Sequence, residues 1–221
     1  MKKFQETLDY RFDDEKLLEL ALSHPSLSGR KEGNNQRLEF LGDAVLGLCV
    51  AELLYKMYPD EAEGPLAKRQ AALICGEQLS KIAKDIGLDK KLLLSTGEED
   101  LGGRENKSNL EDACEALIGA IYLDAGLGAA REFIMRYWEK PAREMQEAPK
   151  DPKTALQEWA QGKGLPLPLY EVVAQSGPSH APNFTVQVSV EGLEPAKAEA
   201  SSKKAAEREA ANLLLESIAL Q

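Results

Sequence analysis

The chain has little that would build a zinc finger or a membrane span. Its three cysteines, Cys49, Cys75 and Cys114, are odd in number, far apart and set among apolar residues, so no pair has zinc-finger spacing. We expect them to be buried, reduced thiols. No apolar run reaches the roughly 18 residues of a bilayer-spanning helix, and the N-terminal residues lack the apolar core of a signal peptide. The sequence therefore predicts a cytoplasmic protein without membrane association.

An excess of positive charge is also missing. The formal net charge is −10 and the pI is about 4.9, whereas contacts to phosphates need Lys and Arg. Residues 150–221 carry seven basic and nine acidic side chains, and residues 1–149 carry 20 and 28. Bulk charge therefore argues against a nucleic-acid binder, and any RNA binding must depend on where a few cations lie. The surplus acids are either solvated surface or carboxylates with a chemical role.

Strand-like alternation is absent from residues 1–146, where apolar residues recur at spacings of three and four. This periodicity predicts an all-α N-terminal domain over residues 1–146. The expected helices cover residues 13–23, 36–57, 65–75, 77–87, 108–125 and 128–145. Ser108 and Glu111 fit a capping box at the start of one of them. The polar, glycine-containing stretch from Ser95 to Lys107 is expected to be a loop.

The pattern changes after residues 147–152, a short segment with two prolines that we expect to be a linker. Asp151 and Pro152 are typical of a helix N-cap and first helical position. Residues 169–176, 183–190 and 194–200 are expected to be strands, and residues 203–218 a final helix. The order α-β-β-β-α predicts a separate α+β domain over residues 153–221.

Two strongly apolar segments carry acidic side chains at helical spacing. Glu39 and Asp43 are four residues apart, and Asp112 and Glu115 are three apart, so each pair shares one face of its helix. Burying such carboxylates is costly unless they are paired. If the two helices pack together, the four carboxylates converge and would suit Mg²⁺, a hard cation that prefers oxygen ligands. Two such ions roughly 4 Å apart would support phosphodiester cleavage.

A simpler interpretation places these acids on exposed helix edges, paired with Arg37 or Lys107. Spacing alone does not show that the two helices touch, so both interpretations stay open on periodicity.

Three segments resemble the ribonuclease III family. The stretch RLEFLGDAVL at Arg37–Leu46 is similar to the family signature, and EDACEALIGAIYLDAG at Glu111–Gly126 is similar to its second acidic helix. ALSHPS at Ala21–Ser26 resembles the stretch that precedes the signature. The resemblance covers nearly the whole chain and implies an endoribonuclease of double-stranded RNA that acts as a homodimer through its signature helices. It further implies products with 5′-phosphate and 3′-hydroxyl ends and short 3′ overhangs, and the processing of ribosomal RNA precursors, mRNA and other structured RNAs.

The same resemblance implies roles for individual acids. Glu39, Asp43, Asp112 and Glu115 would be metal ligands, with Mg²⁺ as the cofactor and Mn²⁺ as the alternative. Of these, Asp43 and Glu115 would be the catalytic pair nearest the hydrolytic ion. Glu63 would be a supporting acid.

Two further positions are informative. Gln36 stands where many family members have Glu, so no carboxylate role is expected there. His24 is a tempting general base, but the family does not use histidine in this way, and we expect a helix-end or core histidine.

The C-terminal domain resembles a double-stranded-RNA-binding domain. Its first helix and the loop after its first strand would contact 2′-hydroxyls in two successive minor grooves, while lysines at the start of the last helix would reach phosphates between them. The expected RNA-binding residues are Thr154, Gln157, Glu158, Gln161, Pro178, His180, Lys203 and Lys204. Glu199 precedes these lysines where the family is usually glycine-rich, and we expect it to weaken RNA binding.

Two other functions compete with the nuclease. The chain could be a non-catalytic RNA-binding regulator, but a retired nuclease would be expected to have lost one of the four acids, and all four are present. It could also be a helical protein-interaction scaffold, which would leave the clustered acids unexplained.

Overall fold

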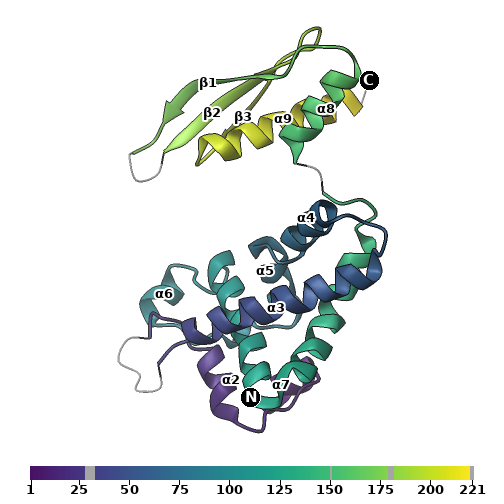
Figure 1. Cartoon of the computed structure of the whole chain (residues 1–221). Coiled ribbons are helices and arrows are strands. Elements are labelled where there is room, and N and C mark those ends of the chain that lie inside the picture. Colours follow the sequence, from purple (N-terminus) through teal and green to yellow (C-terminus); the bar gives the residue numbers. More distant parts are fainter. Residues whose placement is uncertain (28–32, 150, 179–181, 220–221) are drawn as a thin grey trace. The chain divides into compact units, whose positions relative to one another are not determined.

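The computed structural model describes residues 1–27, 33–149, 151–178 and 182–219 and divides the chain into two compact units. The first, Met1–Pro149, is helical, and the second, Lys150–Gln221, combines helices with an antiparallel sheet (Figure 1). The division falls inside the segment that the sequence indicates as a linker. The predicted fold class, an all-α unit followed by an α+β unit, is confirmed.

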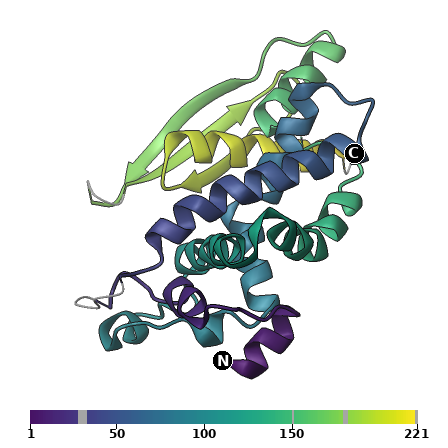
Figure 2. The same cartoon turned by 60° about the horizontal axis from the view of Figure 1, so that its bottom comes forward.

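The first unit is built around two long helices. Its elements are α1 Lys2–Leu8, α2 Glu15–Ala21, α3 Gln36–Met57, α4 Glu63–Leu73, α5 Gly76–Asp85, the 3-10 helix η1 Asp89–Lys91, α6 Thr96–Asp100 and α7 Lys107–Glu144. Helix α3 packs along α7, and α5 and α2 pack against other parts of α7. Figures 1 and 2 both show α3 beside α7.

Helix α7 lies at the centre because its first half is apolar on nearly every side. Ala113, Cys114 and all residues from Ala116 to Ile121 are buried. Gly126 has φ 79° and ψ −176°, outside the helical range, and it separates the two halves of α7. By length and hydropathy α7 could cross a bilayer, but half of its apolar stretch is buried within the unit, as expected of a core helix.

Helices α3 and α7 meet at two glycines. A Cβ atom added to Gly42 would lie 1.8 Å from the carbonyl oxygen of Glu115, and one added to Gly119 would lie 2.2 Å from that of Leu38. Only glycine allows two helix backbones to approach this closely. Asp43 follows the first glycine directly, so the closest approach of the helices falls at two of the predicted metal ligands.

Some details differ from the prediction. The expected loop from Ser95 to Lys107 contains α6, whose start is capped by the Ser95 hydroxyl accepting a hydrogen bond from the Glu98 N–H at 3.3 Å. Helix α7 begins at Lys107, and the Asn106 side chain accepts from the Ser108 N–H, so the predicted capping box is wrong.

The cysteine prediction is correct for two of the three residues. Cys49 and Cys114 are buried free thiols, as expected. Cys75 is exposed, because it precedes α5 as its N-cap on the surface instead of lying inside a helix.

The second unit packs two helices on one face of its sheet (Figure 1). Its elements are α8 Pro152–Gly162, β1 Leu169–Ser176, β2 Asn183–Ser189, β3 Ala196–Ala200 and α9 Lys203–Ala219, with sheet order β1-β2-β3. The side chain of Asp151 accepts hydrogen bonds from the N–H groups of Lys153 and Thr154, as expected of an N-cap. Leu156 on α8, Val188 on β2 and Leu214 on α9 lie in its core.

Candidate metal centre and RNA-binding surface

The four acids predicted as metal ligands lie where α3 and α7 meet. Asp43 is exposed, whereas Glu39, Asp112 and Glu115 are half-buried between the two helices. The glycine contact between the backbones brings the two pairs toward one another, although they are far apart in the sequence.

Electrostatics show that these acids form one cluster. The pKa of Glu115 is raised to about 8, first by burial and then by the charges of Asp43, Glu111, Glu39 and Asp112. Burial raises the pKa of Glu39 as well, followed by the charges of Asp112, Glu111 and Asp43. Burial and like charge thus act in the same direction here, because both disfavour the ionised form of a carboxyl group.

Glu111 is a fifth carboxylate of the cluster, which the sequence interpretation did not single out. It is one helical turn before Glu115, and burial, then the charge of Asp112, raises its pKa. Its carboxylate lies over the first residue of α5, because a Cβ added to Gly76 would be 2.3 Å from Glu111 Oε2. The four-residue spacing to Glu115 is the sequence signal that could have identified it.

The donor set of the cluster consists of carboxylate oxygens, which suits a hard divalent cation. Among the described residues, no ion pair links Arg37 or Lys107 to these acids, so the pairing considered from the sequence is not observed. In the same part of the chain, no three His, Cys, Asp or Glu side chains are close enough to hold a metal ion as they stand. The backbones are thus juxtaposed, while like-charged side chains stay apart.

Removing one acid should stabilise the protein in a metal chelator. A carboxyl with a raised pKa contributes stability below its unfolded-state pKa and loses that contribution as the pH rises through about 8, the folded-state value for Glu115. After a discount for solvent screening of this half-buried group, Glu115→Gln should gain about 1–2 kcal/mol at pH 9. We expect its melting temperature in EDTA to exceed that of the native chain by roughly 2–8 °C at pH 9 and by little at pH 5.

Thermal unfolding of both chains across this pH range, with and without Mg²⁺, measures the effect. Mg²⁺ should raise the melting temperature of the native chain at pH 9 more than that of Glu115→Gln. A native chain whose stability is flat from pH 5 to pH 9 in EDTA would contradict the electrostatic description.

Glu63 and His24, the two other residues considered from the sequence, are not ligands of the acidic cluster in this structure. Glu63 is the first residue of α4 and is exposed, and it is not among the carboxylates that raise the pKa of Glu115. Burial raises the pKa of Asp112, and a positive charge on His24 would oppose that shift. Both ring nitrogens of His24 are hydrogen-bonded, so the imidazole is held in place instead of being open as a base.

In the second unit, the predicted RNA-binding side chains are exposed wherever the structure describes them. Thr154, Gln157, Glu158 and Gln161 lie along the exposed side of α8, at spacings that place them on neighbouring faces. Pro178 is exposed after β1, and His180 lies outside the described residues. Lys203 and Lys204 are the first two residues of α9, where the partial positive charge of a helix N-terminus favours anions.

Two carboxylates lie near the predicted lysines, and Glu207 forms an ion pair with one of them, Lys203. Glu207 on α9 lies 2.5 Å from Lys153 Nζ and 3.9 Å from Lys203 Nζ, so it joins the starts of α8 and α9. Glu199 accepts hydrogen bonds at 3.1 Å from Asn183 Nδ2 and Thr185 Oγ1 on β2. Its effect on RNA binding stays a prediction.

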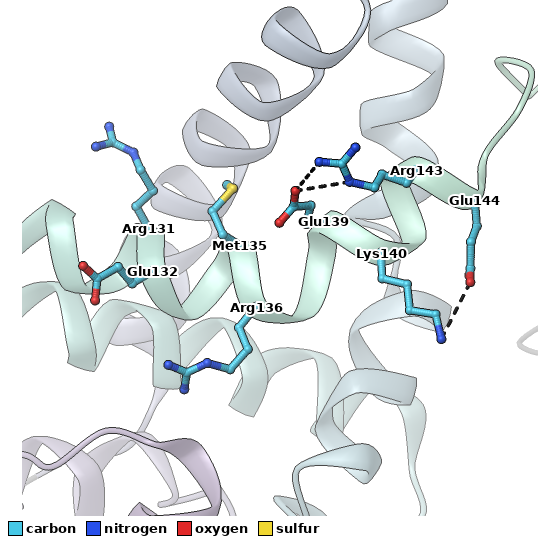
Figure 3. A pocket seen from close by; sticks show the side chains of 8 residues that line it. All are labelled: Arg131, Glu132, Met135, Arg136, Glu139, Lys140, Arg143 and Glu144. Atoms are coloured by element: carbon cyan, nitrogen blue, oxygen red, sulfur yellow. Dashed lines mark hydrogen bonds and ion pairs between the residues drawn. The ribbon is translucent and has the colours of Figure 1, made fainter.

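A surface hollow on the second half of α7 is separate from the acidic cluster (Figure 3). It is lined by Arg131, Glu132, Met135, Arg136, Glu139, Lys140, Arg143 and Glu144. Its cations have carboxylate partners, namely Glu139 for Arg143 at 2.5 Å, Glu144 for Lys140 at 3.7 Å, Glu52 for Arg131 at 3.0 Å and Asp9 for Arg136 at 2.9 Å. Because its positive charges are already paired, the hollow does not have the character of a phosphate site.

The two units and their sites define a class of protein: a helical nuclease domain followed by a double-stranded-RNA-binding domain. A family model described as "Ribonuclease-III-like" matches residues 14–141, and one described as "Double-stranded RNA binding motif" matches residues 152–218. The chain belongs to the ribonuclease III family and is an endoribonuclease acting on double-stranded RNA. Enzymes of this family generally use a divalent metal ion.

Relatives match the chain over nearly its whole length. It is 48% identical over 215 residues to Ribonuclease 3 of Wolbachia pipientis subsp. Culex pipiens (strain wPip), which covers 96% of this chain and 94% of the relative. It is 49% identical over 217 residues to Ribonuclease 3 of Anaplasma marginale (strain Florida), covering 98% and 94%. A crystal structure of the ribonuclease III nuclease domain from Campylobacter jejuni, at 2.2 Å resolution, matches with 45% identity and a TM-score of 0.60, covering 64% of this chain and 95% of that one.

Proposed function

We propose that this endoribonuclease hydrolyses phosphodiester bonds with a divalent ion held between α3 and α7. The observation that carries the proposal is the carboxylate cluster at the glycine contact, where burial and neighbouring charges raise the pKa of Glu115 to about 8. Half-buried carboxylates that repel one another destabilise the fold unless a cation compensates their charge, so their presence here favours a cation-binding role.

Glu39, Asp43, Asp112 and Glu115 are the ligands that we propose. They would reach the ion by side-chain rotation, because the helices that carry them are already in contact. When bound, Mg²⁺ would supply an acidified water for attack on phosphorus and would stabilise the leaving oxygen. Half-burial of Asp112 and Glu115 limits competition from water and strengthens their hold on a cation. Mn²⁺, which also accepts carboxylate oxygens, is the alternative ion.

We also propose that the chain acts as a homodimer through α3. Phe40, Leu48 and Tyr55 are 80%, 56% and 74% exposed, and their spacing places them along one side of this helix. Leu41 and Leu123 line an adjacent hollow. Exposed apolar surface of this kind marks association sites. One solved relative, the Campylobacter jejuni nuclease domain that is 46% identical, is described as flexible in a region involved in dimer formation of that protein.

We propose that the cleavage products have 5′-phosphate and 3′-hydroxyl ends with short 3′ overhangs. As substrates we propose ribosomal RNA precursors, mRNA and other structured RNAs of the cytoplasm. The support for both is the family resemblance of the signature and of the second acidic helix.

The test is digestion of a long RNA duplex and of its separated strands by the full chain, in Mg²⁺, in Mn²⁺ and in EDTA. We expect cleavage of the duplex in either metal, uncut single strands, and product 5′ ends that ligate without prior phosphorylation. Mapping both strands should show the 3′ overhang. Duplex cleavage that continues unchanged in EDTA would contradict metal dependence, and products with 5′-hydroxyl ends would contradict the proposed chemistry.

For the RNA-binding unit, we propose that Lys203 and Lys204 contact phosphates. Replacing both by Ala should weaken binding to all duplex sequences equally. It should also reduce the slope of log Kd against log salt concentration by about one to two. The measurement is a salt titration of duplex affinity in EDTA. Lys197→Ala is the matched control. Lys197 is exposed on β3, and its neighbour Ala198 is buried against the helices, so Lys197 lies on the opposite face of the sheet. Equal salt slopes for the double variant and the native chain would exclude phosphate contacts by these lysines.

A further inference from the structure

Five hydrogen bonds form a closed ring around His24. The Ser26 N–H donates to His24 Nδ1 at 3.1 Å, and His24 Nε2 lies 3.1 Å from Asn109 Oδ1. Asn109 Nδ2 donates to Glu98 Oε1 at 2.8 Å, and the Glu98 N–H donates to Ser95 Oγ at 3.3 Å. The Ser95 N–H closes the ring on Ser26 Oγ at 3.0 Å. The ring joins three chain segments, including the first turns of α7.

The partners in the ring fix the tautomer of His24. Asn109 Nδ2 faces two acceptors, Glu98 Oε1 and the Gly103 carbonyl at 3.0 Å, so Oδ1 is the atom that faces His24 and can only accept. His24 Nε2 must therefore carry the proton, and Nδ1, which accepts from Ser26, must not. In this tautomer, the imidazole links the loop and α7 with both ring nitrogens hydrogen-bonded.

The same loop is also tied to α3. The Asn35 N–H donates to the Ser23 carbonyl at 2.9 Å, and the Asn35 carbonyl accepts from the Glu39 N–H at 2.9 Å. The His24 N–H donates to the Leu93 carbonyl at 3.0 Å, which anchors the loop to the segment before α6.

The loop at residues 23–26 is thus hydrogen-bonded to the starts of both helices that carry the carboxylates, α3 and α7. On the α7 side, Asn109 is one turn before Asp112, and on the α3 side the chain of hydrogen bonds reaches the backbone of Glu39. Asn109 is only 8% exposed, so its bonds are shielded from competition by water. A shift of the loop would disturb the first turns of α3 and α7, which carry Glu39 and Asp112.

We propose that His24 is a positioning residue that sets the spacing of Asp112 and Glu39, and with it the affinity of the cluster for a divalent ion. This inference rests on the proposed metal-dependent cleavage. His24 acts through Asn109 and the loop backbone, and it neither touches the substrate nor transfers a proton. Groups that orient the ligands of a metal typically change metal affinity or activity 10–100-fold when they are replaced.

The experiment measures Mn²⁺ binding to the RNA-free full chain by electron paramagnetic resonance, and the Mg²⁺ concentration for half-maximal duplex cleavage. We expect His24→Leu to weaken Mn²⁺ binding by about 10-fold or more and to raise the Mg²⁺ requirement in parallel. His24→Gln, whose amide can both donate and accept, should restore most of the affinity. Duplex affinity in EDTA should stay within about twofold of native, because the proposed RNA contacts are in the second unit.

Two further variants separate positioning from lost stability. Ile134→Val removes one buried methylene from the second half of α7, away from the ring, and should leave Mn²⁺ binding unchanged. Asn109→Leu breaks the ring from the α7 side while leaving the loop sequence intact, and it should weaken Mn²⁺ binding as His24→Leu does.

The outcomes are distinguishable from those of the proposed function. A native chain that cuts duplex in Mg²⁺, with His24→Leu and Asn109→Leu binding Mn²⁺ as native does, overturns the positioning role alone. An equal loss of Mn²⁺ affinity in Ile134→Val also overturns it. A native chain that neither binds Mn²⁺ nor cuts in either metal overturns the proposed function.

Discussion

Replacing Gly42 by Ala should destabilise the nuclease unit, because this glycine makes a direct backbone contact between α3 and α7. The added Cβ would lie 1.8 Å from the Glu115 carbonyl oxygen and 2.6 Å from its carbon, and both are backbone atoms that cannot rotate away. The two helices would have to separate, which would open a densely packed contact. Overpacking of this kind costs about 3 kcal/mol, against a gain of roughly 1 kcal/mol in helix propensity.

We expect the melting temperature to fall by about 4–8 °C for Gly42→Ala, and similarly for Gly119→Ala, measured by thermal unfolding of the full chain. The matched control is Gly128→Ala on α7, where an added Cβ would have no atom within 4 Å. That variant should be neutral or slightly stabilised. If Gly42→Ala were as stable as Gly128→Ala, the close contact between α3 and α7 would not exist in solution.

Replacing Glu115 by Gln should abolish cleavage while leaving duplex binding intact. The change keeps the size of the side chain and removes one negative ligand from the centre of the cluster, where four other carboxylates act on it. Loss of a metal ligand removes several kcal/mol of transition-state stabilisation, so we expect the cleavage rate to fall by about 10³-fold or more. Duplex affinity should be unchanged, because the proposed RNA contacts lie on α8, on α9 and in the loop after β1.

Single-turnover cleavage and filter binding on the same duplex measure the two effects separately. Glu132→Gln is the control, since Glu132 is an exposed acid on the second half of α7. A Glu115→Gln variant that cuts within tenfold of the native rate would remove Glu115 from the catalytic site. A variant that loses cutting and binding together would indicate a folding defect instead.

The fold could be predicted largely because local periodicity and packing agree. The apolar pattern of α7 predicts its central place, and Asp151 with Pro152 predicts the start of α8. Helix α6, with five residues, is too short for periodicity to reveal, and it is held by the Ser95 cap and by an ion pair between Arg104 and Glu99. The sequence does not determine where α7 starts, because Asn106 and Ser108 are both good cap residues and only the observed hydrogen bond distinguishes them.

The site was predictable in part. Spacing identifies the acid pairs, but their convergence depends on the contact between α3 and α7 at Gly42 and Gly119. The sequence of neither helix alone predicts that contact. The spacing does not single out Glu111, because it directly precedes Asp112 and Glu115, a pair that already accounts for the acidic pattern. The role of His24 could not be inferred from its neighbours in sequence, since the ring that holds it joins residues 85 positions apart, His24 and Asn109.

The most direct measurement is an anomalous difference map from a crystal of the full chain soaked in Mn²⁺. We expect a peak between α3 and α7 within coordination distance of Glu39, Asp43, Asp112 and Glu115, and loss of that peak in Glu115→Gln crystals. A map with no peak at these carboxylates, from crystals of protein that cuts RNA duplex in Mn²⁺, would contradict a metal centre between the two helices.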